Sequence, residues 1–174
     1  TKKGVRLNMW AILKIDRKQI FLLKKDLEQK LNSNVKIYNP KICVEKYLTT
    51  KKKKEIKYNL LGDYVFCFSE KFNSKKTLAT LNYSRGLKYF LKGFESSQSE
   101  ISKFVQVCMD AENKDGFLTQ KIFELKIDKY YKFLNGPFAS NIFQLIEIQK
   151  NKIGFKLGKI KSYICKKDIL FKPI

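Results

Sequence analysis

The sequence contains no histidine, and this absence removes the commonest catalytic side-chain pairs. Without an imidazole there is no Ser–His or Cys–His dyad that could activate a nucleophile. The carboxylates are sparse, and the close pair Asp110 and Glu112 stands at a spacing that does not share a helix face. No phosphate-binding glycine loop is present either. We therefore expect a binding protein with no catalytic residues and no cofactor. A two-carboxylate metal nuclease is the one enzymatic alternative that these absences leave.

Cysteine is scarce and widely spaced. The sequence has 4 cysteines, none of them in a Cys-x-x-Cys pair: Cys43, Cys67, Cys108 and Cys165. With no histidine to complete a ligand set, this spacing argues against a zinc site. It also argues against the disulfide framework of a small secreted domain. We expect no metal site and a reducing compartment, which places the protein in the cytoplasm.

Long apolar runs are missing as well. No stretch approaches the ~18–20 consecutive apolar residues of a membrane-spanning helix, and no segment resembles a signal peptide. The composition still supports a hydrophobic core, because 44% of the residues are hydrophobic and 14% are aromatic. We expect a folded protein of one or two domains that has no membrane partner.

Acidic residues are few relative to basic ones. There are 37 Lys and Arg against 16 Asp and Glu, which gives a net charge of +21. Residues 1–112 hold 24 basic and 11 acidic side chains, and residues 113–174 hold 13 and 5, so both halves are basic. An excess of this size usually indicates a polyanionic partner, most often nucleic acid. The alternative is a compositional bias toward lysine that carries no function.

The clearest structural signal is the apolar run Tyr64–Phe68. It is too short for a helix and follows the turn pair Gly62-Asp63, so it predicts a buried central strand. Alternation would place its odd-numbered residues on one side of the sheet and its even-numbered residues on the other. The charged run Lys51–Lys54 ahead of it predicts a loop through solvent.

Helical periodicity predicts two helices around this strand. Asp16 can cap a helix over residues 17–31, whose leucines recur on one face. Ser97 and Glu100 have the spacing of a capping box ahead of a second apolar face. The remaining strand-like segments are 9–15, 35–47 and 87–91. This order predicts an α+β domain over residues 1–112.

The pattern changes after residue 112. Asn113–Gly116 opens a polar segment, and we expect a linker over residues 113–122. Residues 123–174 read as short strands separated by tight turns, such as Asn135-Gly136-Pro137. Regular short strands of this kind predict a small β-barrel.

Four short motifs occur in order along the chain. They are Trp10-Ala-Ile-Leu-Lys, Leu60-Leu61-x-x-Tyr64-Val65-Phe66, Arg85-Gly86-Leu87-x-x-Phe90 and Asn135-Gly136-Pro137-Phe138-Ala139. This arrangement resembles the NusG family of transcription elongation and antitermination factors from residue 9 to residue 170. The stretch 81–86 is more similar to the specialised RfaH-like paralogues. The resemblance implies an N-terminal domain with an antiparallel sheet flanked by helices, which binds RNA polymerase, and a C-terminal KOW barrel. The protein would be a factor that modulates pausing or termination.

The resemblance also assigns contacts on the polymerase. In that family an apolar patch binds the clamp helices of the β′ subunit, and the matching residues are Leu60, Leu61, Tyr64 and Phe66. The paralogues imply that the β-subunit gate loop is contacted by Thr77, Leu78, Ala79 and Thr80. The alternative is that alternate residues of the patch are simply core. Gly62-Asp63 departs from the family, which usually has a proline at this turn.

Nucleic acid and a second partner are implied too. The family passes close to the non-template DNA strand at the upstream edge of the bubble, and the candidate contacts are Lys51, Lys52, Lys53, Lys54, Asn82 and Arg85. In the barrel, Phe138 and Leu157 match positions that bind a small-subunit ribosomal protein or the termination factor Rho, unless they are core residues. We expect a monomer outside the polymerase complex. The competing interpretation is a ribosome-associated KOW-type RNA-binding protein, which would have no use for the residue 60–68 patch.

Overall fold

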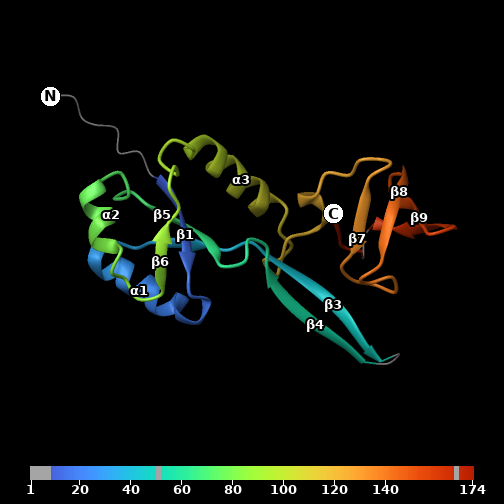
Figure 1. Ribbon diagram of the computed structural model, residues 1–174, viewed down its shortest axis with the longest axis horizontal. Helices are drawn as coiled ribbons and strands as arrows, with labels where there is room; N and C mark the ends of the chain where they lie inside the picture. Colours follow the sequence, from blue (N-terminus) through green and yellow to red (C-terminus); the bar gives the residue numbers. More distant parts are fainter. Residues whose placement is uncertain (1–8, 50–51, 167–168) are drawn as a thin grey trace. The chain divides into compact units, whose positions relative to one another are not determined.

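The run Tyr64–Ser69 forms β5, the strand on which the N-terminal sheet is built (Figure 1). The computed structural model describes residues 9–49, 52–166 and 169–174, without the side chains of residues 45–49, 52 and 53. Internal contacts divide the chain into two units. The first comprises Thr1–Pro40 and Asn59–Val107, and the second comprises Lys41–Tyr58 and Cys108–Ile174. Residues 41–58 therefore group with the C-terminal part, whereas the sequence analysis assigned them to the N-terminal domain.

The sheet of the first unit has four antiparallel strands in the order β2-β5-β1-β6. Their bounds are Met9–Ile15 for β1, Lys36–Tyr38 for β2, Tyr64–Ser69 for β5 and Leu87–Phe90 for β6. β5 pairs with β1 on one side, where Val65 lies opposite Leu13, and with β2 on the other, where Cys67 lies opposite Ile37. The predicted central strand is therefore confirmed.

Alternation along β1 and β5 separates the sheet into two faces. One face carries Leu13, Val65 and Cys67, each exposed by 1% or less. The opposite face carries Trp10 and Phe66, whose ring centroids are 6.4 Å apart. Both faces of β5 are thus packed, which is the burial expected of a strand that consists almost entirely of apolar residues.

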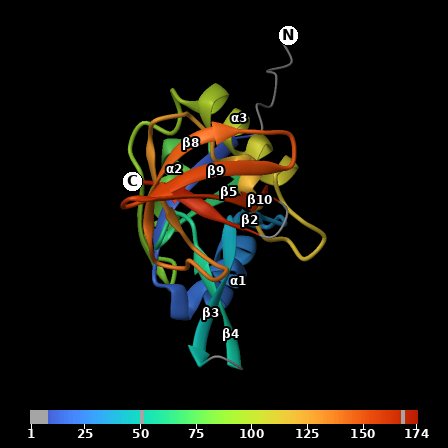
Figure 2. The same ribbon diagram turned by 90° about the vertical axis from the view of Figure 1, so that its right-hand side faces the viewer.

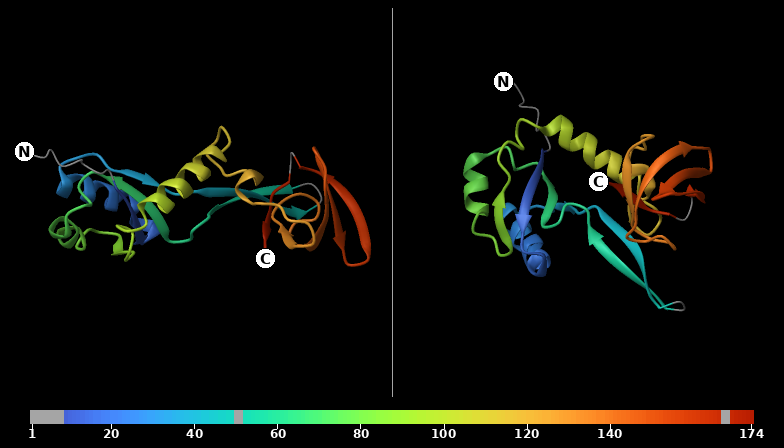
Figure 3. Two further views of the ribbon diagram at one scale, coloured as in Figure 1. Left: turned by 90° about the horizontal axis from the view of Figure 1, so that it is seen from above. Right: turned by 45° about the vertical axis from the view of Figure 1, so that its right-hand side comes forward.

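Helices cover both faces of this sheet. Figure 1 and the right panel of Figure 3 place α1 and α2 on one face and α3 on the other. Their bounds are Ile20–Leu31 for α1, Lys75–Leu81 for α2 and Gln98–Asp110 for α3. The side-chain amide of Gln98 donates to the Trp10 carbonyl at 2.7 Å, and its carbonyl accepts from the Trp10 N–H at 2.9 Å. This reciprocal pair joins the start of α3 to β1.

The predicted first helix is confirmed, except that its first three residues form a 3-10 turn and the α-helix begins at Ile20. The Asp16 carboxylate accepts the Lys18 N–H at 3.0 Å and begins a 3-10 turn, η1 (Arg17–Gln19), which leads into α1. Asn32 ends α1 in the left-handed region, with a φ of 46°. Leu23 and Leu27 on the predicted apolar face are fully buried. The caps and the leucine periodicity together define this helix.

The segment from Lys41 to Asn59 forms a two-stranded antiparallel ribbon in the second unit. Its strands are β3 (Lys41–Thr49) and β4 (Lys52–Asn59), which lie side by side in Figure 3. The prediction of a lysine loop was wrong for Lys52–Lys54, because these residues begin β4. Lys51 lies outside the described residues. Lysine has a modest strand propensity, and pairing with β3 overrides it here.

The C-terminal strands form a five-stranded antiparallel sheet in the order β10-β9-β8-β7-β11 (Figure 2). The bounds are Tyr130–Phe133 for β7, Ile142–Ile148 for β8, Lys152–Leu157 for β9, Ile160–Cys165 for β10 and Phe171–Pro173 for β11. The core of this unit is rich in aromatic rings, with Phe133 at its centre, 4.0 Å from the ring centroid of Phe143. Short strands with tight turns are confirmed. A closed barrel is not, since no pairing joins β10 to β11 among the described residues.

The predicted linker is folded against the second unit. The Asn113 side-chain oxygen accepts the N–H groups of Asp115 and Phe117, both at 3.0 Å, and closes a tight turn. Leu118 is buried and its N–H donates to the Lys41 carbonyl at 2.8 Å. A 3-10 turn, η2 (Gln120–Ile122), follows. The segment is therefore an ordered connection with hydrogen bonds of its own. The sequence indicated only that it is polar.

We expect Asn113→Ala to loosen this turn. The substitution removes both side-chain acceptor bonds, so local opening should become easier by about 1 kcal/mol and tryptic cleavage after Lys114 roughly fivefold faster. Asp115→Ala is the matched control, because only the backbone of Asp115 takes part in the turn. Equal cleavage rates for wild type and Asn113→Ala would contradict the role assigned to Asn113.

Candidate functional site

The candidate docking turn, Asn59–Tyr64, precedes β5. Backbone bonds run from Gly62 N–H to the Asn59 carbonyl and from Tyr64 N–H to the Leu61 carbonyl, both at 3.2 Å. Gly62 has a φ of 62°, a value that strains residues with a side chain. Gly62 therefore shapes this turn without the fixed φ that a proline would supply. Leu60 and Leu61 sit at its tip and are half-buried.

Asp63 ties the docking turn to β1 and to the start of the first helix. Its carboxylate accepts the Arg17 Nε–H at 2.5 Å and lies 3.5 Å from the Lys14 ammonium. The hydrogen bond from Arg17 is the main reason that the pKa of Asp63 lies below its ordinary value. The Asp63 carbonyl also accepts the Ile15 N–H at 3.0 Å. These bonds hold the turn without a proline.

Tyr64 is held by one contact to its hydroxyl and one to the face of its ring. Its hydroxyl lies 2.9 Å from the Tyr89 hydroxyl, and the Lys14 ammonium lies 4.4 Å from the ring centroid. The hydrogen bond to Tyr64 raises the pKa of Tyr89. Tyr64 itself is half-buried, so part of the ring stays accessible. A held aromatic ring loses little conformational freedom on binding, which suits an interface anchor.

Phe66 must be removed from the predicted apolar patch. It is only 3% exposed, because the Phe104 ring of α3 lies 5.8 Å away and the Tyr38 ring 6.4 Å away. With α3 in this position, Phe66 cannot contact a partner. The sequence analysis placed it on the same side as Tyr64, which is correct, but strand periodicity does not reveal which helix covers that side.

The residues assigned to the gate loop lie on α2. Ser74 caps this helix by accepting the Thr77 N–H at 3.3 Å, and Thr80 donates its hydroxyl to the Thr77 carbonyl at 2.7 Å. Ala79 and Thr80 are exposed, whereas Thr77 and Leu78 are half-buried. Asn82, at the end of the helix, is exposed. The helix thus presents Ala79, Thr80 and Asn82 to solvent.

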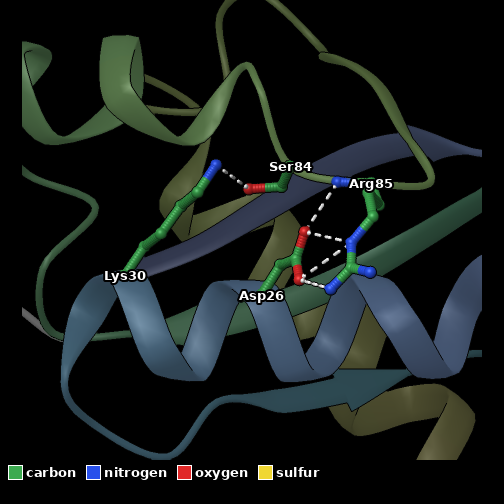
Figure 4. A network of polar contacts seen from close by, with 4 residues as sticks. All are labelled: Asp26, Lys30, Ser84 and Arg85. Atoms are coloured by element: carbon green, nitrogen blue, oxygen red, sulfur yellow. Dashed lines mark hydrogen bonds and ion pairs between the residues drawn. The ribbon is translucent and has the colours of Figure 1, made fainter.

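Arg85 is engaged by Asp26 of α1 (Figure 4). Its guanidinium donates to the carboxylate from Nη2 at 2.6 Å and from Nε at 3.1 Å, and its backbone N–H donates at 2.9 Å. The neighbouring Ser84 accepts from Lys30 of α1 at 3.2 Å. This is a forked pairing, which is geometrically specific. These donors hold the loop that follows α2, while 61% of the Arg85 side chain stays exposed, so the nucleic-acid contact at Arg85 stays a prediction.

Asp26 is a residue that sequence reasoning missed. It is 8% exposed, and the hydrogen bonds from Arg85 lower its pKa from 3.8 to about 2. Gly86, next to Arg85, has a φ of 79°, and a Cβ there would lie 2.9 Å from the Cβ of Gln19. A signal existed in the sequence, since Asp26 precedes Leu27 on the buried side of α1. A carboxylate on the buried side of a helix needs a cationic partner, so this position indicated an ion pair.

The remaining predicted contacts are the lysine run and, in the C-terminal sheet, Phe138 and Leu157. Of the lysine run, Lys54 is exposed, and the side chains of Lys52 and Lys53 are among those not described. Phe138 is half-buried, with ring centroids 5.7 Å from Phe133 and 5.3 Å from Phe155. Leu157 is half-buried against the same core. Both barrel residues therefore contribute to packing, and each keeps an accessible part.

Other polar chemistry is sparse in the described part of the chain. No group of three or more His, Cys, Asp or Glu side chains is placed to hold a metal ion there. The four cysteines are free thiols, and burial raises the pKa of Cys67 to about 12 and that of Cys108 to about 11. None of the described helices has the length and apolarity needed to cross a membrane.

Comparisons with known proteins give structural neighbours only. No family model matches the chain, and no curated protein matches it. Solved structures that match include Thermotoga maritima NusG, with 13% identity over 98% of this chain and 99% of that chain and a TM-score of 0.38. A chain of the MjSpt4:Spt5 complex matches with 11% identity over 97% and 98%, at a TM-score of 0.31. TM-scores this low do not establish a shared fold.

The lowered pKa of Asp26 predicts a pH dependence. A carboxyl whose pKa falls on folding contributes stability that is present above its unfolded value, 3.8, and lost as the pH drops through about 2. Asp26→Asn should therefore lower the urea midpoint at neutral pH, and the difference from wild type should shrink from about pH 4 to about pH 2.

The control for this pH series is Glu95→Gln, which removes an exposed carboxylate of the same unit. Its urea midpoint should follow wild type at every pH. A constant difference between wild type and Asp26→Asn over this pH range would mean that packing, and not ionisation, explains the loss.

Proposed function

We propose that the protein is a transcription elongation factor of the NusG type that binds RNA polymerase in the cytoplasm. The observation that carries the proposal is the docking turn, where Leu60, Leu61 and Tyr64 are held by Asp63, Lys14 and Tyr89. These side chains stand at the positions that bind the β′ clamp helices in the family that the sequence resembles. Partly accessible apolar residues around a fixed tyrosine have the composition of an interface anchor.

The turn also explains why docking would be specific. Asp63 forms ion pairs with both Lys14 and Arg17, so the apolar tip is framed by one carboxylate and the two cations that share it. A partner surface must leave these ion pairs intact. This requirement restricts the orientation in which the partner can bind more than it adds binding affinity.

The other contacts follow from docking on the clamp. Ala79 and Thr80, exposed on α2, support contact with the β-subunit gate loop. Lys51–Lys54 would approach the non-template strand at the upstream edge of the bubble. Asn82 would make a separate contact with the same strand. Arg85 serves this contact by holding the loop next to Asn82. The accessible parts of Phe138 and Leu157 support recruitment of a small-subunit ribosomal protein or Rho by the C-terminal sheet.

Co-purification separates this proposal from the ribosomal alternative. The tagged chain should retain RNA polymerase after nuclease treatment. Recovery of ribosomal subunits without polymerase would favour the ribosome-associated RNA-binding interpretation. The nuclease step is required because a basic protein can carry polymerase on contaminating nucleic acid.

Substitutions in the docking turn should weaken binding to a purified clamp-helix fragment. Tyr64→Ala is expected to cost about 1–2 kcal/mol, a roughly 5- to 30-fold loss of affinity, and Leu61→Asp should cost at least as much. Tyr64→Phe removes only the bond to Tyr89 and should fall between wild type and Tyr64→Ala.

The control is Tyr83→Ala, since Tyr83 is 88% exposed and lies outside the docking turn. Circular dichroism would verify that each variant is folded. Wild-type affinity in a folded Tyr64→Ala variant would remove the docking turn from the interface.

Replacing Lys51–Lys54 with glutamine should reduce the salt dependence of binding to a transcription-bubble scaffold. Each phosphate contact contributes ~0.7–0.9 to the slope of log affinity against log salt, so losing two to four contacts lowers the slope by about 1.5–3.5. Scaffolds that differ only in non-template sequence should bind alike, because lysines on phosphates carry no base information. An unchanged slope would assign these lysines to solubility alone.

A further inference from the structure

The outer face of the C-terminal sheet carries a row of lysines. Along β7–β11, the residues that alternate with the aromatic core point away from it. The lysines of this row are Lys132 of β7, Lys156 of β9, Lys161 of β10 and Lys172 of β11, and Lys152 of β9 faces the same way further along its strand. Gln144 of β8 connects the row, because it lies opposite Lys156 on one side and Tyr130 on the other. The row therefore crosses all five strands, a span of about 19 Å at the usual ~4.8 Å spacing.

These lysines oppose one another directly. Lys132 lies opposite Lys172, and Lys156 lies opposite Lys161. Like charges directly opposite on neighbouring strands destabilise a sheet. In the described part of the chain none of the four forms an ion pair, whereas other cations, such as Lys14 and Arg85, do. The protein thus keeps two unfavourable pairs on one face, and an external polyanion would turn both into favourable contacts.

The strands of this sheet contain one carboxylate, Glu147, and it is already hydrogen-bonded to neighbouring side chains. Glu147 of β8 accepts the Tyr163 hydroxyl at 2.7 Å and the Gln149 side-chain amide at 2.8 Å. These two hydrogen bonds lower the pKa of Glu147, so it stays ionised and bound at neutral pH. It stabilises Tyr163 and leaves the lysines without a partner.

Exposed rings lie beside the lysines. Tyr130 is 56% exposed and shares its face with Lys132, two residues along β7. Tyr163 is 54% exposed, and its ring lies against Gly154, where a Cβ would come within 3.0 Å of the ring carbon Cε1. Glycine therefore lets this ring approach the sheet while Glu147 fixes its hydroxyl. Exposed aromatic rings interleaved with cations are the arrangement that binds single-stranded nucleic acid.

We propose that this outer face binds single-stranded nucleic acid, with phosphates on Lys132, Lys156, Lys161 and Lys172 and bases stacked on Tyr130 and Tyr163. Duplexes bury their bases and cannot use the rings. Lysines and ring faces read neither base edges nor the 2′-hydroxyl, so RNA and DNA strands bind alike. The site is independent of polymerase docking, and neither proposal depends on the other.

The first test compares two double variants of the full chain that remove the same charge. Binding of a labelled mixed-sequence strand of about twelve nucleotides is measured by anisotropy across a salt series. Lys156→Gln/Lys161→Gln should lower the log–log salt slope by about 1.4, at ~0.7 per contact. Lys114→Gln/Lys150→Gln, which changes exposed lysines in turns, should leave the slope unchanged. Equal slopes for the two double variants would overturn the proposal in favour of bulk charge.

A second variant separates a binding role from a structural one. Lys161→Glu places a carboxylate opposite Lys156, so the melting temperature should rise while strand affinity falls. A fall in both would mean that the lysines serve the sheet itself, which overturns the proposal. Tyr130→Ser should weaken binding about 5- to 150-fold through lost stacking, whereas Tyr130→Phe should bind like wild type. Equal binding by Tyr130→Ser and wild type would equally overturn it.

Competitors and crosslinking define the ligand. A strand carrying a photoreactive uridine should crosslink to Tyr130 or Tyr163; crosslinks found only within residues 9–107 would place the site elsewhere. Unlabelled RNA and DNA strands should compete within about threefold of each other, while duplex DNA and polyglutamate should compete at least tenfold less well. Competition by polyglutamate as strong as that of the strands would mean that any polyanion suffices and would overturn the proposal.

Discussion

The constraint on which the first unit depends is that β5 has no side open to solvent. Its odd-numbered residues pack beneath α1, and Phe66 is covered by Phe104 on the other side. A strand buried on both faces and paired on both edges can take part in recognition only through its ends. The docking turn is one such end. Its leucines and Tyr64 are accessible because the chain is only entering the sheet there.

That position brings a requirement for rigidity. A turn without proline would sample many conformations, and ordering it on binding would cost affinity. Asp63 meets the requirement by bonding to Arg17, to Lys14 and, through its carbonyl, to Ile15. The same Lys14 approaches the ring of Tyr64. One carboxylate and one lysine thus link the turn, the first strand and the anchor ring, so the accessible residues are presented in one arrangement.

Local patterns in the sequence predict the parts that local physics decides. The leucine spacing of α1, the Asp16 cap, the alternation in β5 and the turns of the C-terminal strands all follow from neighbours within a few residues. The features that were missed depend on distant residues. Lys52–Lys54 join a strand because β3 lies beside them, and Phe66 is buried because α3 crosses it. The pairing of Asp26 with Arg85 joins residues 59 positions apart, which no periodicity reports.

Net charge has to be divided into paired and unpaired cations before it indicates a ligand. Arg85 already donates to a forked carboxylate, so a phosphate would use only the guanidinium donors that this pairing leaves free. Lys14 and Arg17 share a single carboxylate, that of Asp63. On the C-terminal sheet the situation is reversed, since Lys156 and Lys161 face each other. A bound phosphate there removes a repulsion as well as adding an attraction. The cations that cost the fold something are therefore the ones from which a polyanion gains most, and they lie together on one face of the C-terminal sheet.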